Sequence, residues 1–302
     1  MTLDDLIYQP GLMSGQRILV SGGGGGTGLG RVMAEALLIL GAEIYICGRR
    51  AHVLEATANE LMAAHGGRVV PLVCDIRDEA AIAAMVQQIW DDGGALTGLL
   101  NNAAGNFVSR TEDLSARAFD AIASIVFRGS FVLTLECGKR WLAAGQKASV
   151  LSILTTWVWN GSPYTVPSAM AKAGVHAMTQ SLAVEWGGRG IRFNAIAPGL
   201  FPTEGMSARL NPQGGEHQAV GNPMGRTGRM PELANLAVFL LGPGSEYLTG
   251  QTIAIDGAQF QATGGNFARM ASWTDDDWEL ARRNIQQRNA EDRRQRQPED
   301  PA

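Results

Sequence analysis

The chain has 302 residues, of which 45% are hydrophobic, enough for a single large α/β domain with a buried core. Its formal net charge of −4 at pH 7 offers no basic field for nucleic acid or for an anionic membrane surface. The amino terminus lacks the basic start and apolar run of a signal peptide, and no window approaches the length of a membrane span, so we expect a cytoplasmic protein without a nucleic-acid or membrane partner.

Short apolar runs alternate along the chain with segments of helical periodicity. Strands are predicted, in order, at Arg17–Ser21, Glu43–Cys47, Val69–Cys74, Leu96–Asn101, Ser149–Leu154, Ile191–Ile196 and Thr252–Ile255. Helices are predicted at Gly28–Leu40, His52–Ala64, Glu79–Trp90, Ser115–Ile125, Phe131–Ala143, Lys172–Trp186 and Glu232–Leu241. This alternation predicts an α/β fold: one Rossmann-like, doubly wound parallel sheet of about seven strands, with helices on both faces.

One domain is expected over residues 1–289, because the chain has neither an internal repeat nor a linker. Thr274 is expected to cap a C-terminal helix over Asp275–Asn289, whose acidic start and basic end suit the helix dipole. The charged, proline-containing segment Ala290–Ala302 is predicted to be a disordered tail. The cysteines lack metal-ligand spacing, so no metal site is predicted, and they are expected to be reduced, buried thiols: Cys47, Cys74 and Cys137.

A glycine-rich turn over Ser21–Gly30 joins the first strand to the first helix. Glycine lets the backbone approach a pyrophosphate there, and the N–H groups and dipole of the helix attract its oxygens. Two glycine triplets fit the usual spacing, so the register of the phosphate contacts stays open: Gly22, Gly26 and Gly28, or Gly24, Gly28 and Gly30. The candidate phosphate-contact residues are Ser21, Gly22, Gly26, Thr27, Gly28, Leu29 and Gly30.

The second strand ends at a pair of arginines, Arg49 and Arg50. NAD-preferring enzymes usually carry a carboxylate near this point for the ribose diol. A guanidinium instead suits a 2′-phosphate, which it can bind with two parallel hydrogen bonds. The sequence therefore predicts NADPH as the cofactor.

Several motifs fall at the ends of the predicted elements. Besides the glycine loop they are Asn101-Asn102-Ala103-Ala104-Gly105 after the fourth strand, Lys172 at the start of its helix, and Pro198-Gly199 after the sixth strand. Together they resemble the short-chain dehydrogenase/reductase family over about residues 12–260. Finer matches look like the 2,4-dienoyl-CoA reductase branch, among them Pro167-Ser168-Ala169-Met170-Ala171-Lys172-Ala173-Gly174-Val175 and Arg192-Phe193-Asn194.

This resemblance implies reduction of a conjugated enoyl or 2,4-dienoyl thioester, such as an acyl-CoA, by hydride transfer from NADPH and protonation of the resulting enolate. Lys172 would hold the nicotinamide ribose, and Ser168, in place of the family's usual tyrosine, would position the ribose or the substrate. Asp75 and Ile76 would flank the adenine. The resemblance also places several residues along the cofactor: Asn102, Ala103, Gly105, Pro198, Gly199 and Thr203.

The identity of the proton donor stays open without that tyrosine. Alignment on Lys172 puts Trp157 where mitochondrial-type relatives have a tyrosine and Arg128 where they have its partner asparagine. An arginine there would stabilise an enolate oxygen without releasing a proton. Tyr164, between two prolines and off the lysine's helix, and His176, four residues after Lys172, are candidate donors, with water as a third. A packed loop tyrosine and a hydrogen-bonded core histidine are the structural alternatives.

The substrate side offers further candidates. Thr155 ends the fifth strand where the family keeps an active-site serine, and its hydroxyl can bind a substrate carbonyl. The long loop Leu200–Arg229 is expected to form a lid. Its arginines Arg209, Arg226 and Arg229 are candidates to pair with CoA phosphates, unless they are solvated surface charges. The residues expected to line an apolar acyl pocket, unless the aromatic ones belong to the core, are Asn106, Phe107, Trp157 and Trp159.

Two other functions remain open at this point. One is a carbonyl reductase or alcohol dehydrogenase with a relocated acid, against which Ser168 argues. The other is a cofactor-binding pseudoenzyme or scaffold subunit, against which the retained Lys172 and the arginine pair argue. The resemblance also implies a homotetramer built on the helices Phe131–Ala143 and Lys172–Trp186.

Overall fold

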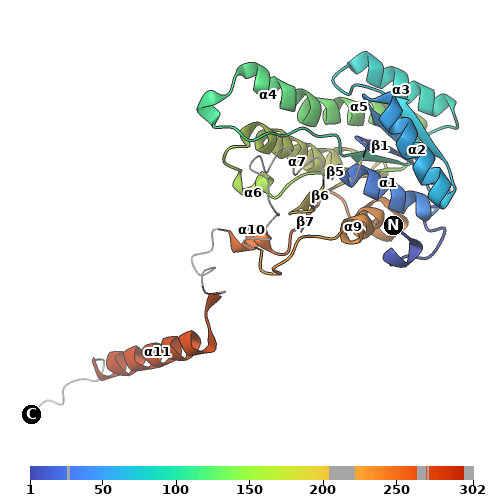
Figure 1. Ribbon diagram of the computed structural model, residues 1–302. Coiled ribbons are helices and arrows are strands. Elements are labelled where there is room, and N and C mark those ends of the chain that lie inside the picture. The colour runs from blue at the N-terminus through green and yellow to red at the C-terminus, as the bar shows by residue number, and fades with distance from the viewer. Residues whose placement is uncertain (26–27, 204–221, 264–269, 271, 296–302) are drawn as a thin grey trace, which may run out of the picture.

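Seven parallel strands form a single central sheet in the order β3-β2-β1-β4-β5-β6-β7 (Figure 1). The computed structural model describes residues 1–25, 28–203, 222–263, 270 and 272–295. The strand bounds are β1 Arg17–Ser21, β2 Glu43–Gly48, β3 Val69–Val73, β4 Gly98–Asn101, β5 Ala148–Ile153, β6 Ile191–Pro198 and β7 Thr252–Ile255. The order reverses between β1 and β4, which confirms the doubly wound α/β sheet and creates a crevice beyond the carboxyl ends of these two strands.

Helices cover both faces of the sheet (Figure 1). One layer contains α1 (Leu29–Ile39), α2 (Ala51–His65) and α9 (Met230–Leu241), and the other contains α3 (Glu79–Asp91), α5 (Ser130–Ala144) and α7 (Val166–Gly187). The remaining helical elements are η1 Leu3–Asp5, η2 Thr111–Asp113, α4 Ala116–Ala123, η3 Ser124–Gly129, α6 Trp157–Asn160, η4 Pro243–Ser245, α10 Gln259–Ala262 and α11 Asp275–Gln295. In Figure 1, α11 extends away from the rest of the molecule.

The sheet separates two apolar cores, which explains why its strands read as continuous hydrophobic runs. Along β2, Ile44 and Ile46 join the core under α1, α2 and α9, while Tyr45 and Cys47 join the core under α3, α5 and α7. The layer with α7 is tightly packed, because a Cβ added at Gly138 of α5 would lie 2.2 Å from the ring of Trp186 on α7. All three cysteines are buried and free, as expected of reduced core thiols.

Two predicted helix boundaries were wrong. Helix α7 begins at Val166 instead of Lys172, since Pro167 is tolerated in a first turn and the Thr165 carbonyl accepts the N–H groups of Ser168 and Ala169. The lysine therefore lies in the second turn. Helix α11 continues to Gln295, so the start of the predicted disordered tail is helical, while residues 296–302 lie outside the described residues.

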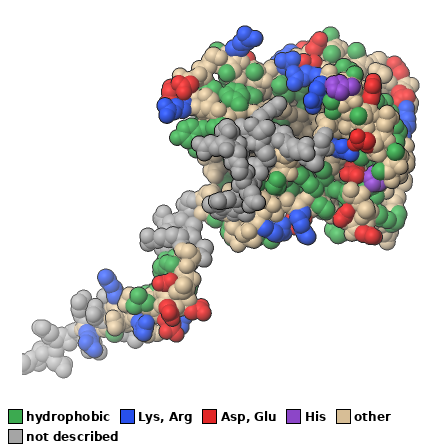
Figure 2. Space-filling model, in the orientation of Figure 1, with side chains coloured by type: hydrophobic (Ala, Val, Ile, Leu, Met, Phe, Trp, Pro, Cys, Tyr) green, Lys and Arg blue, Asp and Glu red, His purple; other side chains and the backbone are tan. Residues whose placement is uncertain are grey.

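The prediction that no window approaches a membrane span was also wrong by length and composition. The helical stretch Ala116–Ala144 contains an 18-residue window with a mean hydropathy of 1.6. Of that window 33% is buried, and the α5 residues Leu133, Cys137 and Trp141 are buried in the core against α3 and α7. On the face shown in Figure 2, acidic and basic side chains are interspersed.

The two described ends of the expected lid meet beside β6. The N–H of Gly228 donates to the carbonyl of Leu200 at 2.9 Å, and Phe201 packs where a Cβ at Gly228 would stand. Residues 204–221, which make up most of the expected lid, lie outside the described residues.

Candidate cofactor and active site

The turns after β1 and β4 are held together at the crevice. The hydroxyl of Ser21 accepts the N–H groups of Asn102 and Ala103 at 3.0 and 3.1 Å. The side-chain amide of Asn102 donates to the carbonyls of Ser21 and Gly22, both at 3.1 Å. Ser21 is buried and its hydroxyl joins the two turns, while its expected contact with the cofactor stays a prediction.

The glycine loop forms a tight cradle that fits a pyrophosphate. Gly22 has a φ of +67°, and a Cβ there would lie 2.9 Å from the Cα of Ala103. A Cβ at Gly24 would lie 2.7 Å from Leu54, and one at Gly30 would lie 2.3 Å from the amide of Asn102. Helix α1 begins at Leu29, and its N-cap residue has no side chain to satisfy the first N–H groups, which suits an anionic ligand. The predicted contacts Gly26 and Thr27 lie outside the described residues.

A cavity of about 230 Å³ lies beside this cradle. It brings together six predicted cofactor residues: Gly22, Arg49, Arg50, Asp75, Ile76 and Ala103. Both arginines are exposed, and neither forms a salt bridge with any other residue that the structure describes. Burial raises the pKa of the lining thiols Cys47 and Cys74 to about 12 and about 11, so both stay neutral near pH 7.

Asp75 is held in a defined position at the edge of this cavity. The N–H of Arg77 donates to Asp75 at 3.1 Å and its guanidinium Nε at 2.9 Å. The hydrogen bonds from the Arg77 side chain lower the pKa of the Asp75 carboxyl. The carboxylate is therefore a fixed acceptor, which suits the amino group of an adenine.

Lys172 and Ser168 are buried on the same face of α7, one turn apart. The ammonium of Lys172 donates to the carbonyl of Ile153, the last residue of β5. Burial lowers its pKa to about 8, and an ammonium carries three donors. Just beyond β5, the hydroxyl oxygen of Thr155 is buried and has no hydrogen-bond partner within the described part of the chain. These groups fit the ribose hydroxyls and carbonyl oxygen of a bound cofactor and substrate.

Other predicted cofactor residues lie along the same edge of the sheet. Pro198 ends β6, and the N–H of the next residue, Gly199, donates to Ile255 of β7 at 3.0 Å. A Cβ at Gly199 would lie 2.7 Å from Asp256, so the backbone is closely packed there. Gly105 lies after β4 next to Ile122, and Thr203 is half-buried three residues into the lid.

The side chain of Arg128 forms hydrogen bonds with residues that lie away from Lys172 and Thr155. Its guanidinium donates to the carbonyl of Arg77 at 3.1 Å and pairs with Glu79 at 3.2 Å. Val126 packs against Ala171 of α7, and the next residue, Phe127, contacts α7 at Gly174, so Arg128 is turned towards α3. In this structure the guanidinium of Arg128 is therefore engaged away from Lys172, and its expected electrophilic role stays a prediction.

The two candidate proton donors occupy different environments. Tyr164 lies in the turn before α7, as expected, with its side chain 59% exposed and a φ of +63°, which is strained for a bulky residue. His176 instead contacts the hydroxyl of Thr252 in β7 through Nδ1 at 2.9 Å. Burial lowers the pKa of His176, so the imidazole is neutral at pH 7. This environment is the one expected of a hydrogen-bonded core histidine.

The expected substrate residues separate into two groups. Trp159 is 38% exposed and stacks on Phe260 of α10 with ring centroids 4.8 Å apart, and Trp157 is half-buried at the start of α6. Phe107 packs with the buried cluster of Ile122, Val126 and Ala171, and the side-chain carbonyl of Asn106 accepts the N–H of Phe107 at 2.9 Å. Phe260 could be found in the sequence only as an aromatic residue shortly after the last predicted strand, and it was not predicted to belong to the site.

Of the three arginines expected to pair with CoA phosphates, Arg209 lies outside the described residues, and Arg226 and Arg229 share one carboxylate partner. Both pair with Glu232, at 2.7 and 3.1 Å, and hydrogen bonds from Arg226 lower the pKa of that carboxyl to about 2. Their partner follows them closely in the chain, at the start of α9.

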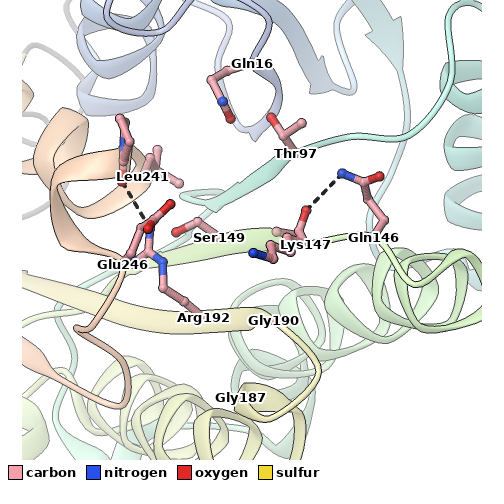
Figure 3. Close-up of a pocket in the computed structure, with 13 residues that line it drawn as sticks. Gln16, Thr97, Gln146, Lys147, Ser149, Gly187, Gly190, Arg192, Leu241 and Glu246 are labelled. Carbon is pink, nitrogen blue, oxygen red and sulfur yellow. Dashed lines mark hydrogen bonds between the residues drawn. The ribbon is translucent and has the colours of Figure 1, made fainter.

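A larger pocket of about 380 Å³ lies at the opposite, amino edge of the sheet (Figure 3). Lys147, Arg192 and Glu246 line it. The guanidinium of Arg192 donates to the carbonyls of Leu248 and Leu240 at 3.1 and 3.0 Å. The hydrogen-bond donors of this guanidinium are engaged by backbone carbonyls of the protein itself. We therefore place the functional site at the carboxyl edge of the sheet.

Comparisons with known proteins identify the family of the chain. Residues 24–258 match a family model described as enoyl-(acyl carrier protein) reductase. A probable 2,4-dienoyl-CoA reductase of Caenorhabditis elegans is 38% identical, with 95% of this chain and 94% of the relative covered. A citronellol catabolism dehydrogenase of Pseudomonas aeruginosa is 34% identical with a TM-score of 0.73, covering 85% of this chain and 100% of that one. The Pseudomonas aeruginosa RhlG/NADP active-site complex is 29% identical with a TM-score of 0.75, covering 84% and 100%.

Proposed function

We propose, from the premise that the chain belongs to the short-chain dehydrogenase/reductase family, that it reduces a conjugated 2,4-dienoyl thioester, such as an acyl-CoA, with NADPH. The chain is an oxidoreductase of this family. The observation that carries the proposal is the buried Lys172 with Ser168, instead of a tyrosine, one turn before it. A relative named as a probable 2,4-dienoyl-CoA reductase supports this substrate class.

The chemistry of the described residues favours enoyl reduction over alcohol oxidation. When bound, the reduced nicotinamide supplies the hydride. Lys172 donates to the ribose hydroxyls and adds positive charge beside the reacting atoms, and Thr155 donates its unpartnered hydroxyl to the thioester oxygen. Alcohol oxidation also needs a group that takes a proton from the carbinol, a task for which serine is poorly suited. Reducing a conjugated thioester requires donors aimed at the thioester oxygen, which stabilise the enolate left by hydride transfer, and a proton for the enolate carbon, which water supplies.

The preference for NADPH is supported by the arginine pair. Arg49 and Arg50 line the cavity of about 230 Å³ beside Asp75 and Ile76, which we name the adenosine cavity. They form no salt bridge with other described residues, so both can bind a 2′-phosphate. The structure named as a RhlG/NADP complex is a neighbour of the same fold.

A carbonyl reductase with a relocated acid is the second candidate function. The exposed, strained Tyr164 favours it, since strained residues cluster at functional sites. The carbonyl of Tyr164 accepts the N–H of Ser109 at 2.9 Å, which ties its turn to the segment after β4. The loss of the usual tyrosine is the feature that argues for a pseudoenzyme.

We also propose a homotetramer in a reducing compartment, the cytoplasm. The exposed apolar side chains Phe131 of α5 and Val184 of α7 support association through these helices. The free, buried cysteines suit a reducing environment. Light scattering of the purified protein measures the oligomeric state.

The test of the proposed function follows NADPH absorbance with a 2,4-dienoyl-CoA, a 2-enoyl-CoA and a set of ketones. We expect turnover of the dienoyl thioester, and its loss in Lys172→Met. Ketone reduction that disappears in Tyr164→Phe would instead establish the second candidate. Tight NADPH binding without turnover of any substrate would leave the pseudoenzyme.

A further inference from the structure

The segment that joins α4 to α5 lies between the two halves of the candidate site. This segment, η3, is a π-helix over Ser124–Gly129, a form found mainly as single turns at functional sites. One side of η3 packs on the helix that carries Lys172. Val126 shares a buried cluster with Ala171, and a Cβ added at Gly174 would lie 2.6 Å from the ring of Phe127.

The other side of η3 packs on the turn between β3 and α3. Ile125 lines the adenosine cavity together with Ile76 of that turn. A Cβ added at Gly129 would lie 2.9 Å from both the side chain and the carbonyl oxygen of Ile76, so the two backbones are in close contact. The π-helix therefore connects helix α7 to the wall of the adenosine cavity.

Arg128 fastens this contact with two hydrogen bonds. It donates to the carbonyl of Arg77 at 3.1 Å and to the carboxylate of Glu79, the first residue of α3, at 3.2 Å. Arg77 in turn fixes the carboxylate of Asp75. The guanidinium of Arg128 thus holds the end of the β3–α3 turn that leads into α3, and the other end of the turn, at Asp75 and Ile76, lines the adenosine cavity.

We propose that Arg128 is a positioning residue for the adenosine half of the dinucleotide and acts through the β3–α3 turn. The proposal deepens the proposed cofactor site and rests on it. Because the side chains of Arg128 and Glu79 are 50% and 72% exposed, their ion pair is weak. The expected effect of losing both bonds is therefore a change of about three- to tenfold in affinity.

The experiment measures the affinity for the adenosine half by calorimetry with adenosine 2′,5′-bisphosphate. Arg128→Met should bind it about three- to tenfold more weakly than the wild type, and should raise the KM for NADPH while kcat at saturation stays within about twofold. Reduced nicotinamide mononucleotide, which lacks the adenosine half, should support the same rate in both proteins. Arg128→Lys should recover part of the affinity, since an ammonium can reach one of the two acceptors.

Arg117→Met is the matched control, because it also removes an exposed positive charge, from the neighbouring α4, and should bind as the wild type does. A lower kcat in Arg128→Met with unchanged affinity for the bisphosphate would overturn the proposal in favour of a role at the reacting oxygen. Unchanged affinity and kinetics would overturn it as well. If Arg128→Met fails to fold, Glu79→Gln, which removes the ion pair and keeps the bond to Arg77, replaces it with a smaller expected loss.

The experiment can refute the preference for NADPH without refuting the positioning role of Arg128. A wild-type protein that binds 5′-ADP but not the bisphosphate refutes the preference for NADPH, and the same comparison made with 5′-ADP still decides whether Arg128 positions the turn. A wild-type protein that binds neither ligand refutes the adenosine site and the proposal together.

Discussion

The buried ammonium of Lys172 should make the protein less stable than a variant without it. Burial lowers the pKa of this group from its ordinary value of 10.5 to about 8. At about 1.36 kcal/mol per pH unit, keeping the charged form buried at pH 7 costs about 3 kcal/mol. Lys172→Met removes that cost but also the hydrogen bond to Ile153, which is worth about 1 to 2 kcal/mol. The variant should therefore be more stable than the wild type by about 1 to 2 kcal/mol at pH 7.

The pH dependence separates this cause from better packing by methionine. Between about pH 8 and 10.5, the unfolded wild-type chain binds a proton that the folded lysine has already lost. Wild-type stability relative to the variant therefore rises with pH. The difference between the two proteins should shift by about 2 to 3 kcal/mol in favour of the wild type from pH 7 to pH 10, which removes or reverses the advantage of Lys172→Met.

Urea unfolding of both proteins at pH 7 and pH 10, without cofactor, measures the two differences. Lys172→Met should also gain less stability than the wild type from saturating NADPH, because it has lost donors to the ribose. A variant that is less stable than the wild type at pH 7, by the same amount as at pH 10, would refute the reasoning. That result would mean that the ammonium is fully compensated within the folded chain.

Three further variants test the site. Replacing both Arg49 and Arg50 by alanine should weaken NADPH binding by about ten- to hundredfold in calorimetry and leave NADH binding unchanged. A wild-type protein that binds the two cofactors with equal affinity would contradict this prediction. Thr155→Val should lower the rate of dienoyl-thioester reduction by about tenfold or more. Thermal stability should be kept or raised, since the buried hydroxyl has no partner in the described part of the chain. Full activity of the variant would show that this hydroxyl takes no part in the reaction. His176→Phe should lose the contact with Thr252 and melt a few degrees lower, and because the pKa of this imidazole is lowered, the pH profile of kcat from 6 to 8 should not change. A profile that changes would restore the proton relay.

The strands and most helices followed from local patterns. The predicted bounds Arg17–Ser21 and Thr252–Ile255 coincide with β1 and β7, because turn residues and apolar runs mark both ends of these strands. The start of α7 did not follow from its pattern. Val166 and Pro167 resemble a loop in sequence, yet the backbone of Thr165 receives the first N–H groups, so the helix begins a turn and a half before Lys172.

Side-chain placement at the site depended on contacts that no local pattern reveals. The adenosine cavity was foreseen because its residues follow strand ends, which meet at one edge of a parallel sheet. The hydrogen bonds of Arg128 could not be predicted, because its partners, Arg77 and Glu79, lie about fifty residues away in the chain. The π-helix likewise arises from tertiary packing, where Gly129 lies against Ile76 and Phe127 against Gly174.

Two energetic costs coincide at the carboxyl end of β5. The buried ammonium of Lys172 costs about 3 kcal/mol, and the unpartnered hydroxyl of Thr155 adds about 1 to 3 kcal/mol, together a large share of the about 5 to 15 kcal/mol that stabilises a typical domain. Neither group is needed to fill the core, since methionine and valine have similar shapes. A bound ligand that offers acceptors to both groups would recover these costs on binding. The same two groups are therefore best explained as the part of the fold that is completed by the cofactor and the substrate.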